Sequence, residues 1–324
     1  MRWLTDESGA TIVLAAAAMV GVLALAGLAV DLGAAYVERR ELVSGADAAV
    51  LAVAEDCATS SSACAAATAK ETALRYARDN ASDGAAGVDF VDLDRVGRSV
   101  RVGVSTLNPD GTTIVPRYFS RVVGWEGVTV RAEATARWGF PSSLRSTIPL
   151  IISDCEFPAN EPLPTAERVI YFHDGNSTEP CNATAGMDSD GDGKLAGGFG
   201  WLVTDGVCAV DLAIGAWESD DPGASPSNGC TPDLIWDLLG EPVPLPFFDD
   251  LTGVGANGRY HVGGFGYFHI TGFNFGSHYK APSAATAPCS GDERCVSGYF
   301  TTGVIYEGEL GGPDHGLRLV ELVE

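Results

Sequence analysis

The stretch Ala10–Val30, ATIVLAAAAMVGVLALAGLAV, decides how the rest of the chain is organised. It carries no charge over about 21 residues, the length of helix that crosses a hydrocarbon core of about 30 Å. Within lipid the backbone polar groups of such a run are satisfied only in a helix. Asp31 ends the run, because a carboxylate is costly inside lipid. The stretch therefore predicts a transmembrane helix.

A cleaved signal peptide is the alternative, since Ala24-Leu25-Ala26 resembles a cleavage site. Two features favour an anchor. The apolar run is longer than the usual h-region of about 7–15 residues, and the positive charge of Arg2 is offset by Asp6 and Glu7.

Helical character continues beyond the span. Residues 31–57 contain no proline, and Tyr36, Val43 and Val50 recur every seven residues. Leu32, Ala46 and Val53 fall near the same face, while Arg39 interrupts it. The pattern allows a coiled-coil seam, but one amphipathic helix that packs on its own domain is the favoured interpretation.

The next segments alternate between one helix and several strands. Ala65–Asn80 has helical spacing, and Ser82-Asp83-Gly84 ends it. We expect strands at residues 88–91, 100–105, 113–115 and 128–137, and a short helix at 117–123. Residues 31–140 thus predict a helix rooted in the membrane with a small sheet on its outer part, which by analogy is pilin-like.

From Pro141 onward, turn-forming residues punctuate the chain every few positions. Strand-like runs occur at residues 147–152, 168–172, 260–270 and 298–306. The sequence predicts an α+β protein in four parts: a cytoplasmic head at 1–9, a transmembrane helix at 10–30, a helical stalk with a pilin-like domain at 31–140, and an irregular, mostly β, disulfide-stapled domain at 141–324.

The cysteines indicate the compartment. They are eight in number and spread along the chain: Cys57, Cys64, Cys155, Cys181, Cys208, Cys230, Cys289 and Cys295. None forms a CxxC pair, which disfavours a zinc ribbon or a thioredoxin-type site. Cys57–Cys64 and Cys289–Cys295 could close short loops, and Cys155–Cys181 and Cys208–Cys230 longer ones, although sequence does not fix the connectivity. Disulfides need an oxidising environment, so we expect the N-terminus inside and the bulk of the chain outside.

The net charge is −23, which disfavours nucleic acid as a partner because phosphate binding needs a basic surface. The expected partners are a membrane and other proteins.

The N-terminal residues resemble a known family. Gly9-Ala10 leads the apolar span, and Leu28–Gly33, Tyr36, Arg39–Leu42 and Ala46–Ala49 follow in order. This set is similar to the N-terminal signature of TadE/TadG-like Flp pilus-assembly proteins over residues 9–56. Tyr118–Gly124 with Val128–Ala136 also resembles the segment that follows in TadG-like members.

The resemblance implies a non-enzymatic component of, or accessory to, a tight-adherence (Flp) pilus assembly system. It further implies a single-pass protein of the bacterial cytoplasmic membrane, extracytoplasmic beyond the span, whose N-terminal helix contacts other Tad/Flp proteins. The sequence departs from the family in two ways: a von Willebrand A-type metal motif is absent, and Leu14 stands where major Flp pilins have a glutamate after their cleavage site. A minor pilin or adhesin that binds a surface or glycan is one alternative, and an anchored or secreted hydrolase is another.

The sharpest local motif is Asp188-Ser189-Asp190-Gly191-Asp192-Gly193, which matches the opening of a calcium loop. Asp188, Asp190 and Asp192 would supply carboxylates, and Lys194 its backbone carbonyl. Phe199 stands where an EF-hand has its bidentate glutamate, which disfavours an EF-hand. The motif is consistent with a looser calcium site, which could borrow Asp205 or Asp211, and equally with an Asp/Gly-rich surface turn.

Other motifs point to chemistry more weakly. His261 and His269 could share a strand face as zinc ligands, although ordinary surface histidines are the favoured interpretation. His173-Asp174 suggests part of a hydrolytic triad, but no G-x-S-x-G motif accompanies it. The Gly/aromatic run Gly263–Gly276 is either an exposed aromatic surface or, as we favour, a set of core strands with tight bends.

Overall fold

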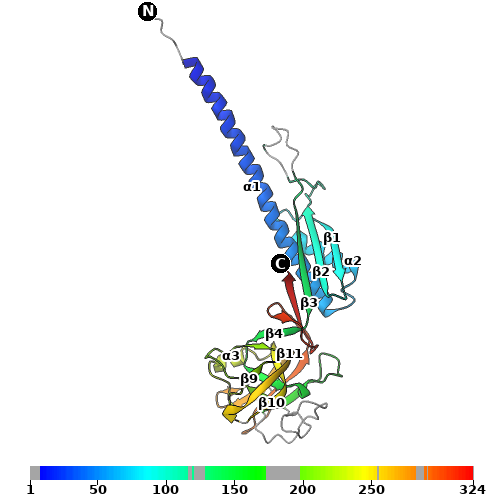
Figure 1. Ribbon diagram of the computed structural model, residues 1–324, viewed down its shortest axis with the longest axis vertical. Helices are drawn as coiled ribbons and strands as arrows, with labels where there is room; N and C mark the ends of the chain where they lie inside the picture. Colours follow the sequence, from blue (N-terminus) through cyan, green and yellow to red (C-terminus); the bar gives the residue numbers. More distant parts are fainter. Residues whose placement is uncertain are drawn as a thin grey trace, which may run out of the picture. The chain divides into compact units, whose positions relative to one another are not determined.

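The computed structural model describes residues 8–115, 119, 128–172, 198–253, 255–281, 288–289 and 291–323. The chain divides into two compact units (Figure 1). The first contains Met1–Arg137 with Leu322–Glu324, and the second contains Trp138–Glu321.

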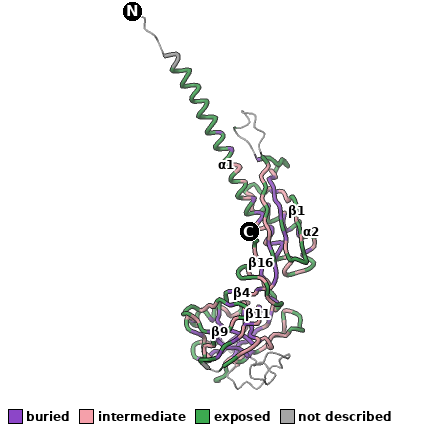
Figure 2. The backbone as a smooth tube through the Cα atoms, viewed as in Figure 1, coloured by how far each residue is buried: buried purple, intermediate pink, exposed green. Residues whose placement is uncertain are grey.

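The first unit is built on α1 (Ser8–Thr59), a continuous helix of 52 residues. At a rise of 1.5 Å per residue it extends for about 78 Å, more than twice the thickness of a hydrocarbon core. Residues 11–26 of its N-terminal half are exposed (Figure 2), whereas Leu42, Ala46, Val50 and Val53 of its C-terminal half are buried. The amphipathic helix predicted to pack on its own domain is confirmed for this second half.

The second helix, α2 (Ala66–Asp79), lies against the end of α1. Ala69, Ala73 and Ala77 are buried, and these small side chains allow the two helices to approach closely. The Thr72 hydroxyl donates to the Asp56 carboxylate across the pair at 2.8 Å. A disulfide between Cys57 and Cys64 closes the connection. The helix predicted at residues 65–80 is thus confirmed to within one residue at each end.

An antiparallel sheet completes the first unit, with β1 (Ala86–Asp94), β2 (Ser99–Thr106) and β3 (Arg131–Gly139). Val100, Val102 and Val104 of β2 are buried, and α1 packs against this strand. The predicted strand at residues 113–115 does not form. There the Val115 N–H donates a backbone hydrogen bond to the Val128 carbonyl at 3.1 Å. Most of the short helix predicted at 117–123 lies outside the described residues.

The second unit is organised around an eight-stranded sheet. The strand order along its main path is β6 (Arg168–Tyr171), β13 (Cys295–Thr301), β11 (Arg259–Gly276), β10 (Pro242–Thr252), β5 (Leu150–Ser153) and β7 (Phe199–Trp201), while β9 (Trp217–Ser219) and β12 (Tyr279–Lys280) pair with β11 off this path. A parallel bridge between Phe172 and Phe199 joins the two ends of this order, so the sheet closes on itself.

Aromatic side chains fill the space that this sheet encloses. The largest buried ones are Phe199, Trp201, Phe247, Phe268, Phe273, Phe275 and Phe300. Their rings meet mostly edge to face, as for Trp201 and Phe275 at 5.0 Å between centroids. This arrangement is the one that aromatic quadrupoles favour, and it adds to the free energy of simple burial.

Smaller elements surround this core. A second sheet holds β15 (Glu309–Leu310), β4 (Pro141–Ser146) and β8 (Val210–Ala213), and β14 (Gly303–Ile305) pairs in parallel with β16 (Leu317–Val323). The short helix α3 (Pro232–Trp236) begins at Thr231, whose hydroxyl accepts the Leu234 N–H. The predicted α+β class, with an apolar N-terminal helix and a disulfide-stapled β unit, is confirmed.

Candidate anchor and interaction surface on the long helix

The first turns of α1 expose an apolar surface. The large apolar side chains between residues 12 and 25, such as Ile12, Leu14, Val20 and Leu25, are 63–71% exposed. The mean hydropathy of the most apolar window of the helix is 2.6. Only 6% of that window is buried, so this part of α1 does not lie in the core of a globular unit. Of the described residues, this is the one helix long and apolar enough to cross a membrane.

The predicted heptad stripe divides into two parts. Ala46, Val50 and Val53 are buried within the first unit. Leu32, Tyr36 and Val43 are 50%, 64% and 42% exposed. The first unit therefore covers only the C-terminal part of this stripe and leaves the N-terminal part exposed. Leu32 and Tyr36 form an apolar surface just beyond Asp31.

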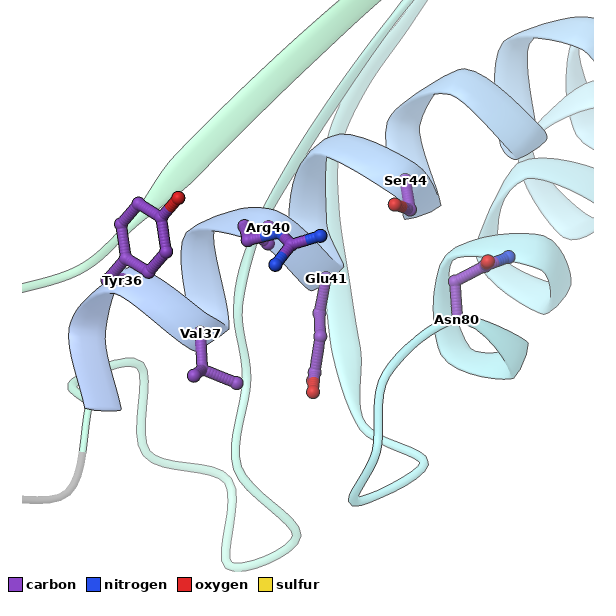
Figure 3. A pocket seen from close by; sticks show the side chains of 6 residues that line it. All are labelled: Tyr36, Val37, Arg40, Glu41, Ser44 and Asn80. Carbon is purple, nitrogen blue, oxygen red and sulfur yellow. The ribbon is translucent and has the colours of Figure 1, made fainter. Parts of the chain in front are cut away.

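A groove of about 380 Å³ lies beside this surface. Tyr36, Val37, Arg40, Glu41 and Ser44 of α1 line it together with Asn80, the residue that ends α2 (Figure 3). The Glu41 carboxylate accepts the Ser82 N–H at 3.0 Å, which fixes the loop after α2 to the same helix. The groove offers apolar, cationic and amide groups within a short distance.

A second groove of about 290 Å³ lies where α1 faces the sheet, beside Arg39 and Val43. Val43, Phe90 and Ala132 give it an apolar lining. Its charged rim contains an ion pair of 3.3 Å between Arg131 and Asp89 and another of 2.6 Å between Glu133 and Arg101. Exposed pairs of this kind contribute about 0–1 kcal/mol to stability.

The cysteines are oxidised wherever the structure describes them. Disulfides join Cys57 to Cys64, Cys208 to Cys230 and Cys289 to Cys295, three of the pairings that the sequence suggested. Cys155 is disulfide-bonded as well, and Cys181 lies outside the described residues.

The predicted calcium ligands Asp188, Asp190, Asp192 and Lys194 also lie outside the described residues, as does His173-Asp174. Asp211, one of the two carboxylates proposed to complete that site, forms an ion pair of 2.6 Å with Arg145. The calcium site remains a prediction from the sequence.

The histidines of the second unit occupy separate environments. His261 bonds Asp249 at 2.5 Å with the Trp217 ring against it, whereas His269 stacks on Tyr299. His315 contacts Asp154 at 3.1 Å. Within the described parts of the chain, no group of three His, Cys, Asp or Glu side chains is placed to hold a metal.

The Asp249–His261 pair is a feature that sequence reasoning missed. The two residues are 12 positions apart, and the pairing of β10 with β11 brings them together. A triad would also need a nucleophile bonded to the imidazole. His261 instead has the Trp217 indole packed on its ring, at 5.0 Å between centroids.

The Gly/aromatic run lies on β11. Its four phenylalanines, Phe265, Phe268, Phe273 and Phe275, are buried. The interpretation of this run as an exposed aromatic surface is therefore wrong, and the core-strand interpretation is confirmed.

These features define a class: an α+β protein whose single apolar helix fits a single-pass membrane anchor and continues into a disulfide-closed domain. Residues 9–56 match the family model for Flp pilus-assembly TadE/G-like proteins, which confirms the resemblance predicted over the same residues. No curated protein and no solved structure gave a significant match. The family match supports an association with Tad/Flp pili and suggests a non-catalytic role.

Proposed function

We propose that this protein is a structural component of, or accessory to, a tight-adherence (Flp) pilus assembly system. In this proposal residues 10–30 of α1 cross the bacterial cytoplasmic membrane once, and both units stand on its outer side. The observation that carries the proposal is the coincidence of the family match with a helix of two halves: the matched residues 9–56 contain both the exposed apolar run and the buried part of α1.

The disulfides support the outward orientation. They occur in both units, at Cys57–Cys64 in the first and at Cys208–Cys230 and Cys289–Cys295 in the second. Such bonds form and persist in oxidising compartments and are rare in the cytosol. Large domains are translocated largely regardless of flanking charges such as Arg39 and Arg40.

The partner surface in this proposal is the exposed part of α1 beyond Asp31, with the Tyr36 groove beside it. Aromatic and arginine side chains are enriched where proteins contact each other. Tyr36 is 64% exposed and shares its groove with Arg40. The adhesin alternative would need a ligand surface on the second unit, and the phenylalanines of the Gly/aromatic run, the candidate for such a surface, are buried.

Cell fractionation with a protease applied from outside tests the topology. We expect the intact chain in the membrane fraction, cleavage from outside, and a mass that shows oxidised thiols. A chain recovered in the cytosol with eight free thiols would contradict the anchor and the orientation together.

Photocrosslinking in cells tests the partners. A photoreactive residue at Tyr36 should crosslink to other Tad/Flp proteins. Val96, which is 97% exposed in the turn between β1 and β2, is the matched control and should not. Equal crosslinking from both positions, or crosslinks to unrelated proteins alone, would contradict the pilus assignment.

A further inference from the structure

Asp31 binds a segment far away in the sequence. Its side chain stands at the end of the apolar run, yet the residue is only 7% exposed. The backbone N–H of Phe119 points to its carboxylate, at 3.2 and 3.3 Å from the two oxygens. The N–H is shared between the two oxygens of a charged acceptor, so Asp31 holds the backbone of Phe119 against α1.

Gly27 provides the space for this contact. A Cβ atom on Gly27 would lie 2.5 Å from Phe119 Cβ and 2.8 Å from Cγ, closer than side-chain atoms approach each other. Residues 27 and 31 are four apart and lie on the same face of the helix. Gly21 and Gly33 of α1 have nothing within 4 Å of such a Cβ, so the close approach is specific to Gly27.

The contact also fixes the depth of Phe119 along α1. Gly27 lies four residues, or about 6 Å, on the apolar side of Asp31. Phe119 is 52% exposed there, and Leu23 and Val30, which flank Gly27 along α1, are 63% and 51% exposed. These are the side chains that lipid covers if residues 10–30 cross a membrane.

We propose that Phe119 is a second membrane contact, which inserts its ring into the interfacial layer of the bilayer beside α1. This inference rests on the proposed membrane anchor. Phenylalanine, like tryptophan and leucine, is typical of the apolar face of segments that lie at the boundary between headgroups and acyl chains. Interfacial apolar groups typically insert about 5–10 Å, which agrees with the depth set by Gly27.

The test uses the full-length chain reconstituted in vesicles of phosphatidylethanolamine and phosphatidylglycerol. Because the described cysteines are all disulfide-bonded, an introduced thiol can carry a nitroxide label selectively. Labels replace Leu23 in the predicted span, Phe119, and Val96 as the fully exposed control. Oxygen collides more often with labels in lipid, and a water-soluble nickel chelate with labels in water.

We expect the ratio of oxygen to nickel collisions to be severalfold higher at Leu23 and Phe119 than at Val96. Lipid access at Leu23 with water access at Phe119 would overturn this inference and leave the anchor intact. Protection of Phe119 from both reagents would mean that protein covers it, which also overturns the inference. Water access at both positions would refute the anchor and the inference together.

A matched pair of glycine variants tests whether the close contact at Gly27 places residue 119 in lipid. Gly27→Leu should displace the label at position 119 toward water, while Gly21→Leu, which meets nothing, should leave it in lipid. If the labelled Phe119→Cys protein does not insert, Phe119→Trp with lipids brominated at known depths gives the same readout. Quenching equal to that of the unsubstituted protein would overturn the inference.

Discussion

Asp220 and Glu218 of the second unit are partly buried, and burial disfavours the charged form of a carboxyl group. Burial raises the pKa of Asp220 above its ordinary value of 3.8, although a hydrogen bond with Tyr260 opposes the shift. Burial also raises the pKa of Glu218, on the neighbouring strand β9, and that of Tyr260 itself. The free energy of unfolding of this unit should therefore depend on pH through these residues.

The sign of that response follows from the direction of the shift. A carboxyl whose pKa is higher in the folded state binds protons more tightly there, so its contribution is present at low pH and is lost as the pH rises through the folded pKa. We expect Asp220→Asn to weaken this pH dependence and to unfold at higher urea than the parent protein at neutral pH. The urea concentration at the midpoint of unfolding, measured between about pH 3 and 7, tests both expectations. Glu307→Gln, at an exposed position, is the control and should leave the profile unchanged.

The acidic residues of the predicted calcium loop allow a second test by single substitution. If Asp188, Asp190 and Asp192 form a calcium loop, the protein should bind calcium with the millimolar to submillimolar affinity of weak extracellular sites, roughly 10⁻⁴–10⁻³ M. Asp190→Asn should weaken binding in calorimetry, and Asp292→Asn should not. Unchanged calorimetric heats in the Asp190 variant would favour the surface-turn interpretation.

Among the elements, β10 shows how a strand can escape sequence analysis. Its sequence PVPLPFFDDLT places three prolines inside a central strand, where proline normally argues against that assignment. Pro242, Pro244 and Pro246 occupy alternate positions, so the hydrogen-bond donors that they lack would all face the same edge of the strand. The Pro244 carbonyl on that side accepts the Ser146 hydroxyl at 3.1 Å, and the recorded pairing with β5 begins only at Phe247. The other side pairs with β11 from Pro242 to Thr252, with register shifts between Phe247 and Asp250.

This arrangement predicts opposite effects at adjacent positions. Leu245→Pro should remove a hydrogen bond to β11 and leave its acceptor unpaired, which costs about 1–3 kcal/mol beyond the lost packing. Pro244→Val should cost much less, because its nitrogen faces away from β11. Leu245→Ala separates the lost packing from the lost bond, and urea unfolding of all three provides the comparison. A proline effect no larger than the alanine effect would contradict the proposed orientation of the strand.

Elements with a strong period could be predicted from sequence, and those that depend on distant partners could not. The apolar run, the alanine-rich α2 and the alternating valines of β2 each carry their own local signal. Residues 113–115 carry the same β-branched composition but gain only an isolated backbone bond, so they do not form a strand. The contact of Asp31 with Phe119 spans 88 positions and has no local signal.

At the scale of the whole molecule, the chain combines two units that each have their own core. The second has an enclosed aromatic core, a closed strand order and the disulfides Cys208–Cys230 and Cys289–Cys295. The sequence indicated this division through its change in composition at Pro141, and the structure divides the chain between Arg137 and Trp138. The closure of the sheet could not be foreseen, because it depends on one bridge between Phe172 and Phe199.

Residues 138–321 should consequently fold alone. We expect the isolated segment to be soluble, with near-ultraviolet circular dichroism from its packed aromatic rings. Replacing Cys208 and Cys230 by alanine should lower its free energy of unfolding by about 2–5 kcal/mol. A segment that shows β-type far-ultraviolet signal without near-ultraviolet signal would contradict an independently packed core.

The disulfide at the end of α1 has a mechanical consequence. A pull on the N-terminal end of the helix travels along its backbone, past the buried residues 42–53, to its C-terminal end at Thr59. Cys57, two residues before that point, is covalently joined to Cys64, just before α2 begins. Tension therefore passes from one helix to the next through a sulfur–sulfur bond, and the residues between them cannot be drawn out. Under load, the joint between the two helices therefore keeps its length.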